Sequence, residues 1–257
     1  MVEVKIGKHS VVLYDAIDIL PIARFHRYQK LLMVDSGIGG DIAAFDTRCE
    51  KMRRFLILGD VENAQKELDN LRQSVFLIQN SISPKYRAFA ALVAKVDDKD
   101  FPDASDDSVE KILEMLSDVP VNEITDQLGS VKKKIDNELN VYFPAVFNDS
   151  EVREYYVRLR NRTVAILKNL ADGKETVADD VVERLTTELI TYSKPKKFDG
   201  SDGVEITFDR QFENLCLILS EQLHVEPKGF TVLEFYNAFE FVQERARRAE
   251  RGANKAK

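Results

Sequence analysis

The stretch VENAQKELDNLRQSVFLIQNSI, residues 61–82, carries apolar side chains at alternating steps of three and four. That spacing predicts a helix with one apolar face and is typical of a heptad repeat. Such a face needs a long helical neighbour. A repeat this short favours a bundle within the chain over a coiled coil between chains, and the second arrangement stays open. The residues of the repeat are Val61, Ala64, Leu68, Leu71, Val75, Ile78 and Ile82.

The same spacing continues through most of the chain and predicts further helices. Strict alternation, the pattern of a strand, occurs over residues 2–6 and as a second candidate over residues 204–208. We therefore expect an all-α fold, a multi-helix bundle with a C-terminal helical pair and at most a short N-terminal strand segment. The expected helices run from Tyr14 or Pro21 to Gly37, from Asp41 to Gly59, from Pro84 to Val93, from Ser108 to Ser117, from Asn122 to Phe143, from Asn148 or Asp149 to Gly173, from Val177 to Tyr192, from Phe212 to Leu223, and onward from Thr231.

Two segments rich in charge and turn residues divide the chain. The acidic stretch 97–107 is a hinge or linker candidate, and residues 194–206 combine a proline, two glycines and charges. The sequence therefore predicts a helical bundle domain over 1–193, a linker over 194–206, and a C-terminal helical pair with a basic tail over 207–257.

The composition excludes several classes of protein. The 257 residues include 37 Lys and Arg against 44 Asp and Glu, a net charge of −7, which argues against nucleic acid binding over the whole surface. Cys49 and Cys216 are far apart, so neither a disulfide framework nor a zinc site is indicated. The N-terminus does not read as a signal peptide, and no apolar run approaches the length of a membrane helix. We expect a soluble protein in a reducing compartment.

The sequence shows no motif of an active site. The glycine-rich residues 36–41 lack the spacing of a phosphate-binding loop, and the acidic segment lacks the glycine and glutamate of a calcium-binding loop. His9, His26 and His224 are dispersed, without Cys or carboxylate neighbours at metal-ligand spacing. We therefore expect no enzyme, no catalytic residue, no cofactor and no metal site.

The helix from Thr231 onward has a well-defined start and a basic end. Thr231 and Glu234 have the spacing of a capping box. Its apolar residues form one stripe with Tyr236 at the edge and Phe241 nearly opposite, which fits either a core-facing helix with one exposed ring or a helix that docks on a partner. The arginines complement the helix dipole or bind an acidic partner or packaged DNA. The candidate partner-binding residues are Phe235, Tyr236, Phe239, Phe241, Arg245, Arg247 and Arg248.

Two stretches resemble phage proteins. Residues 13–41, LYDAIDILPIARFHRYQKLLMVDSGIGGD, resemble uncharacterised proteins encoded among the structural genes of bacteriophages and prophages of gut bacteria, and that likeness extends over most of the chain. Residues 227–240, PKGFTVLEFYNAFE, are similar to the C-terminal helix of phage tail assembly chaperones. The chain is longer than many of those chaperones.

The resemblance implies a phage assembly protein, a tail assembly chaperone that holds a tape-measure or tail-tube protein through apolar helix faces in the bacterial host cytoplasm. The alternative is a component of the virion, such as a connector, tail or packaged protein, which oligomerises and contacts DNA or an acidic partner. The expected partners are phage structural proteins, with homo-oligomer formation left open. Nucleic acid would be contacted only by the C-terminal tail, and a membrane not at all.

Overall fold

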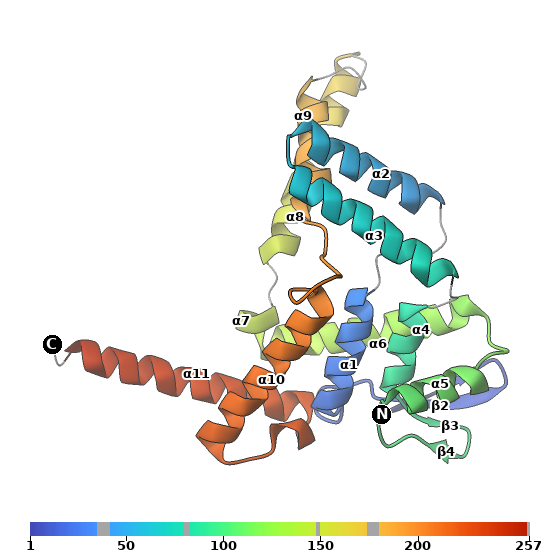
Figure 1. The fold of residues 1–257 in the computed structure, drawn as a ribbon, viewed down its shortest axis with the longest axis vertical. Helices are drawn as coiled ribbons and strands as arrows, with labels where there is room; N and C mark the ends of the chain where they lie inside the picture. Colours follow the sequence, from blue (N-terminus) through green and yellow to red (C-terminus); the bar gives the residue numbers. More distant parts are fainter. Residues whose placement is uncertain (35–41, 80–82, 148–149, 174–179, 256–257) are drawn as a thin grey trace. The chain divides into compact units, whose positions relative to one another are not determined.

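The computed structural model describes residues 1–34, 42–79, 83–147, 150–173 and 180–255 (Figure 1). Within them the protein is mostly helical, with a small four-stranded antiparallel sheet. The chain forms two compact units: unit 1 comprises Met1–Asp35, Ser83–Pro144 and Val204–Lys257, and unit 2 comprises Ser36–Ile82 and Ala145–Gly203. These units are not contiguous in sequence, unlike the predicted division into 1–193, 194–206 and 207–257. The acidic stretch 97–107 lies inside unit 1.

The elements follow each other with short connections. Unit 1 contains β1 (Val2–Ile6), β2 (His9–Leu13), α1 (Ile22–Val34), α4 (Pro84–Leu92), β3 (Val93–Val96), β4 (Lys99–Asp100), α5 (Asp106–Met115), α6 (Val121–Tyr142), α10 (Val204–Leu223), the 3-10 turn η1 (Pro227–Gly229) and α11 (Val232–Lys255). Unit 2 contains α2 (Ile42–Ile57), α3 (Val61–Gln79), α8 (Ser150–Ala171) and α9 (Asp180–Tyr192), and the short α7 (Pro144–Phe147) begins at the junction.

The sheet has the strand order β1-β2-β3-β4, with every neighbouring pair antiparallel. The strand predicted over residues 2–6 is therefore confirmed as β1. The strand suggested over residues 204–208 is wrong, because these residues form the first turn of α10. Val204 and Phe208 are four residues apart, so their spacing also fits one helical face.

The capping geometry confirms the predicted start of α4 and corrects the predicted starts of α5 and α6. Ser83 caps α4 as its side chain accepts a hydrogen bond from the Tyr86 amide at 3.4 Å. Helix α5 is capped by Ser105 and not by Ser108. Helix α6 starts after Pro120, whose fixed backbone angle suits that position, so Asn122 is not its cap. The predicted boundaries Gly37, Asp41, Asn148, Asp149 and Val177, and the last heptad position Ile82, lie outside the described residues.

The core of unit 1 lies between α1, α4 and α6. The apolar side of α6 is buried over its whole length, from Ile124 to Phe143, as the period of the sequence predicts. Helix α1 buries Ile22, Phe25 and Tyr28. Its outer side then carries the C-terminal helices α10 and α11.

A buried arginine fixes the position of α1. The guanidinium of Arg24, 3% exposed, donates hydrogen bonds to the carbonyl oxygens of Ala91 at 3.1 Å, Val93 at 2.9 Å and Asp103 at 2.8 Å, and also to Phe101. These carbonyls belong to the end of α4, to β3 and to the segment that follows β4. One side chain therefore ties α1 to three separate pieces of backbone.

Unit 2 has a polar interior. Glu67 of α3 is fully buried and accepts a hydrogen bond from Arg48 of α2 at 2.8 Å and one from Asn70 at 3.1 Å. Lys51 of α2 is also buried, and its attraction to Glu67 opposes the lowering of its pKa by burial. The hairpin of α2 and α3 is therefore held in register by charged groups.

Less than half of the heptad repeat is covered in the described part of the chain. Ala64 and Leu71 are buried, whereas Val61, Leu68, Val75 and Ile78 are exposed. The packing predicted for this helix within the chain is therefore present, but it covers only part of the repeat. The physical reason is that α3 turns Glu67, and not the centre of the stripe, toward α2.

We expect Arg24→Met to destabilise the protein by about 3 kcal/mol, because four buried carbonyls would lose their charged donor. Arg24→Lys should recover only part of this loss, since one ammonium group cannot replace the planar fork of the guanidinium. Urea unfolding followed by circular dichroism measures the effect. Arg210→Met, at an exposed position of α10, is the matched control, and an equal change in both variants would contradict the role of Arg24.

Candidate partner-binding surfaces

The start of α11 is anchored to unit 1 by its backbone. The predicted capping box is present: the Thr231 amide donates to Glu234 Oε2 at 2.8 Å, and the Glu234 amide donates to Thr231 Oγ1 at 3.3 Å. The Val232 amide donates to the Leu20 carbonyl at 2.9 Å, and the Ile22 amide donates to the Phe230 carbonyl at 2.8 Å. The first turn of α11 is therefore joined to the segment that leads into α1.

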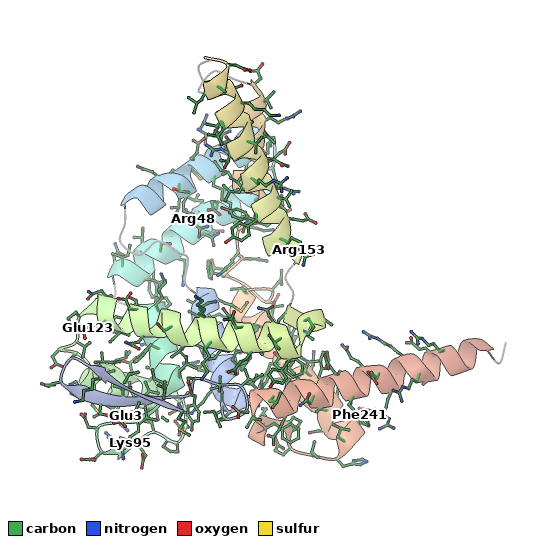
Figure 2. The ribbon with its side chains drawn as sticks, turned by 180° about the vertical axis from the view of Figure 1, so that it is seen from behind. Glu3, Arg48, Lys95, Glu123, Arg153 and Phe241 are labelled. Atoms are coloured by element: carbon green, nitrogen blue, oxygen red, sulfur yellow. The ribbon has the colours of Figure 1, made fainter. Side chains whose placement is uncertain are left out.

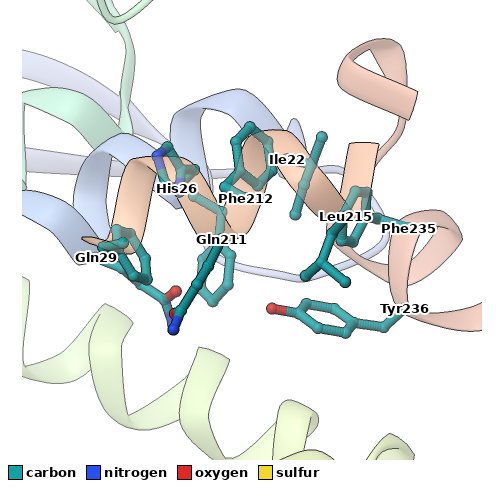
Figure 3. A pocket seen from close by; sticks show the side chains of 10 residues that line it. Ile22, His26, Gln29, Gln211, Phe212, Leu215, Phe235 and Tyr236 are labelled. Atoms are coloured by element: carbon teal, nitrogen blue, oxygen red, sulfur yellow. The ribbon is translucent and has the colours of Figure 1, made fainter. Parts of the chain in front are cut away.

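A pocket of about 100 Å³ lies between α1, α10 and α11 (Figure 3). The ring of His26 stacks on Phe208 with centroids 4.5 Å apart and on Phe212 with centroids 4.1 Å apart. Phe235 of α11 stacks on Phe212 at 5.8 Å, and the Tyr236 hydroxyl points into the pocket. Aromatic rings from three helices thus meet at one point.

Charged groups at the rim of this pocket neutralise one another. His26 Nε2 donates to Asp209 Oδ1 at 2.9 Å, and Lys30 Nζ donates to Asp209 Oδ2 at 2.6 Å. Burial lowers the pKa of His26 despite the neighbouring carboxylate. Burial acts to raise the pKa of Asp209, but the hydrogen bonds from Lys30 and His26 outweigh it and lower that pKa. Burial also raises the pKa of Tyr236 to about 12.

The size and lining of the pocket suit packing better than ligand binding. Pockets for small molecules usually measure about 300 to 1,000 Å³, several times this volume. The imidazole of His26 favours its neutral form and is already stacked on both sides. We conclude that the pocket anchors α10 and α11 on α1.

The predicted partner-binding residues fall into an anchored and an exposed group. Phe235 is 1% exposed and Tyr236 lines the pocket, so both residues pack within the fold, and a partner cannot reach Phe235. Phe239 is half-buried, whereas Phe241 is exposed on the helix that extends from unit 1 (Figure 2). The interpretation of a core-facing helix with one exposed ring therefore describes residues 232–241 correctly. The remaining candidates, Arg245, Arg247 and Arg248, are all exposed.

Beyond Phe241 the side chains of α11 interact along their own helix. The Arg245 guanidinium lies over the Phe241 ring at 5.9 Å from its centroid, and Arg248 pairs with Glu244 at 2.9 Å. Every described side chain from Glu244 to Arg251 is exposed. This half of α11 is an accessible helix with an aromatic residue and several arginines.

A second surface, of which the sequence predicted only the α3 stripe, lies on the helical hairpin of unit 2. Apolar side chains form one stripe along α2 and one along α3. Each of these side chains is between 39 and 54% exposed, except Met52, which is half-buried. We name these residues together the hairpin face. The hairpin face consists of Phe45, Met52 and Leu56 of α2 and Val61, Leu68 and Val75 of α3.

Helical geometry places both stripes on one side of the hairpin. At about 100° per residue, the α2 stripe lies about a quarter-turn from the side that carries Arg48 and Lys51, and the α3 stripe lies about a quarter-turn from Glu67. In both helices the rotation from the side that faces the other helix to the apolar stripe has the same direction when viewed from the N-terminus. Because the helices are antiparallel, the two stripes therefore lie on the same side of the hairpin. Arg54, on the opposite side of α2, is bound by α9. Helix α9 therefore covers one side of the hairpin and leaves the hairpin face open.

A groove of about 500 Å³ lies between α2 and α9 on that covered side. Arg54 in its wall donates to Glu183 Oε1 at 2.7 Å and to Glu50 Oε1 at 2.7 Å, and it also donates to Thr187. Because two carboxylates already hold its guanidinium, Arg54 is not available as an anion site. We assign the groove a structural role.

His9, the first residue of β2, lies between two carboxylates. Its Nδ1 is 2.8 Å from Asp97 Oδ2 and its Nε2 is 3.1 Å from Asp118 Oδ1. Both ring nitrogens can donate only when the imidazole is protonated, so these two hydrogen bonds, foremost that to Asp97, raise the pKa of His9. Among the described residues, no three His, Cys, Asp or Glu side chains are grouped so that they could hold a metal ion.

We expect the two histidines to titrate in opposite directions from the ordinary pKa of 6.5. His9 stabilises the fold fully below pH 6.5, and this stabilisation is lost as the pH rises through its raised pKa. His26 acts in reverse, because protonation of the buried ring opposes folding as the pH falls below 6.5. An NMR titration of the imidazole protons measures both values. Asp97→Asn should lower the pKa of His9 and leave that of His26 unchanged, whereas shifts of one sign in both histidines would contradict the assignment.

No helix in the described ranges combines the length and the apolar character that crossing a membrane requires. Comparison of the chain with models of known protein families, with curated proteins and with solved structures gives no match.

Proposed function

We propose that this protein is a non-catalytic phage assembly protein that holds another polypeptide, in the manner of a tail assembly chaperone in the host cytoplasm. The observation that carries the proposal is the division of α11. Its first turns are fixed by the capping box and by Phe235, while its second half carries Phe241 and the arginines on an open helix.

The chemistry of this open half suits a helical partner. Binding energy in interfaces is concentrated in a few aromatic and arginine side chains, and amphipathic helices commonly dock along grooves or other helices. Phe241 and Arg245 already lie against each other, so part of the ordering cost is met before binding. The local positive charge opposes the net charge of −7 and selects a partner with acidic groups. A tape-measure or tail-tube protein is the proposed partner.

The alternative function, a structural component of the virion, is favoured by a different observation. The hairpin face leaves apolar side chains of unit 2 open to a neighbour, as in proteins that form permanent assemblies. A connector, tail or packaged protein would keep such a face covered in the finished particle.

A chain that ends after Glu240 tests the proposed role of α11. This variant keeps the capping box, Phe235 and Tyr236, whereas a cut at Gly229 would also remove the anchor. We expect the truncation to abolish capture of the tape-measure or tail-tube protein in co-expression and pull-down. The double substitution Phe241→Ser and Arg245→Glu should weaken capture about 100-fold, the loss of two binding hot spots.

Leu217→Ser, at an exposed position of α10, is the matched control and should leave capture unchanged. Full capture by the truncated chain would contradict the proposal. Mass spectrometry of purified particles separates the two functions, because a chaperone is absent from the particle and a structural component is present in fixed proportion.

A further inference from the structure

We infer that the hairpin face binds the hairpin face of a second copy of this chain, so that two hairpins of α2 and α3 form a four-helix bundle. This inference concerns unit 2 and is independent of the role proposed for α11. It rests on the heptad pattern, on the position of the uncovered side and on the charges along its edges.

The heptad pattern shows that one neighbour is missing. In a two-helix contact both alternating positions of the repeat are buried. Here Ala64 and Leu71 are buried, whereas Val61, Leu68 and Val75, the other alternate set, are exposed, as is Ile78 near the end of the helix. Helices of bundles bury a wider stripe against two neighbours at once. Helix α3 has the sequence of such a bundle helix but, among the described residues, packs against one helix, α2, where a bundle helix packs against two.

The second hairpin of the same chain does not fill this place. Helix α9 binds the opposite side of α2 through Arg54 and Glu183, and α8 packs along α9, where Arg162 donates to Thr186 at 2.8 Å. The interior of unit 2 is therefore closed by polar contacts on that side. Its hairpin face is a separate apolar surface.

The edges of the hairpin face are complementary to themselves in charge. The Arg48–Glu67 ion pair fixes which residues of the two helices lie at one level. Counting outward from it, Arg53 on the outer edge of α2 lies at the level of Glu62 on the outer edge of α3. A two-fold axis parallel to the helices stacks α3 of one copy on α2 of the other and brings Glu62 to the level of Arg53 of the other copy. Within each copy Arg53 already pairs with Glu50 at 2.7 Å and Glu62 with Lys66 at 2.6 Å, so the contact joins two existing ion pairs into one network.

At the other end of the hairpin the same operation brings two carboxylates to one level, and a cation lies near both of them. Asp46 of α2 lies at the level of Asp69, one turn from Arg72. In the paired state Arg72, which already binds Asp69 at 3.4 Å, then lies between that carboxylate and Asp46 of the other copy. Leu68 meets the side of α2 that carries Phe45. A second copy thus matches both the apolar centre and the charged rim, which argues for self-association over an unrelated partner.

The size of the face indicates a moderate affinity. Helix α3 is about 28 Å long at 1.5 Å per residue, and two helices about 10 Å wide give a footprint of about 500 Å² per copy. Stable interfaces commonly bury about 800 Å² per partner. We therefore expect a dimer at micromolar concentrations.

Sedimentation equilibrium of the full chain over about 1 to 200 μM tests the inference, because a micromolar dimer changes its population across that range. The wild type should reach twice the monomer mass of 29.3 kDa. Leu68→Glu should raise the dissociation constant about 100-fold, since it places a carboxylate at the centre of the apolar contact. Leu217→Glu, an equally drastic change on α10, should leave the dimer intact.

A charge exchange separates loss of binding from loss of folding. Arg53→Glu alone should weaken the dimer, and the double variant Arg53→Glu with Glu62→Arg should restore it, because the pair is only reversed. Circular dichroism confirms that each variant keeps the helical content of the wild type. A wild type that stays monomeric at 200 μM, a Leu68→Glu variant that still dimerises, or a double variant no better than the single one would overturn the inference. If unit 1 of the same chain or another protein occupied the hairpin face, the wild type would stay monomeric, which is the first of these three results.

Discussion

The buried guanidinium of Arg24 is the interaction on which the arrangement of unit 1 depends. By donating to carbonyls at the end of α4, in β3 and after β4, it fixes α1 against pieces of chain about 70 residues away in sequence. An uncapped helix end in an apolar interior is costly, and a planar group with five donors is suited to satisfy several carbonyls at once. Once α1 is fixed, its His26 ring stacks on Phe208 and Phe212 of α10. The anchored half of α11 therefore depends on Arg24 indirectly.

In unit 2 several polar and charged side chains are buried, and many large apolar side chains are exposed. Glu67, Asn70 and Arg54 lie inside, while many of its large apolar side chains remain exposed. Buried ion pairs contribute more to a unique register than to net stability, because desolvation offsets most of their attraction. A hairpin held in register by charges can leave an apolar stripe open without losing its shape. This is the physical basis for assigning the hairpin face to a second copy.

The two proposed surfaces belong to different units and have different chemistry. The open half of α11 is basic with one aromatic ring, which suits a different and acidic polypeptide. The hairpin face is apolar with edges of both signs, which suits itself. A dimer formed through the second surface would present two copies of the first, and a long partner bound at two points is held more tightly than by either point alone.

The sequence by itself determined those features that depend on near neighbours. The 3.6-residue period placed the buried side of α6, and the three-residue spacing of Thr231 and Glu234 placed the start of α11, because both are decided within one or two turns of helix. The strand over residues 2–6 was likewise readable from its alternation, and Phe241 was correctly placed opposite the packed stripe.

Only the tertiary structure decided which apolar and charged side chains are inside. Arg24 is indistinguishable in sequence from a solvent-facing arginine. Phe235 was a candidate to meet a partner but packs on Phe212. The heptad repeat predicted a helical neighbour, and the side that α3 buries against α2 carries Glu67. The burial of each of these side chains depends on residues far away in the chain. The two units likewise combine segments that are distant in sequence. A local pattern fixes which side of a helix is apolar, whereas the neighbour that covers that side is selected by the free energy of the whole fold.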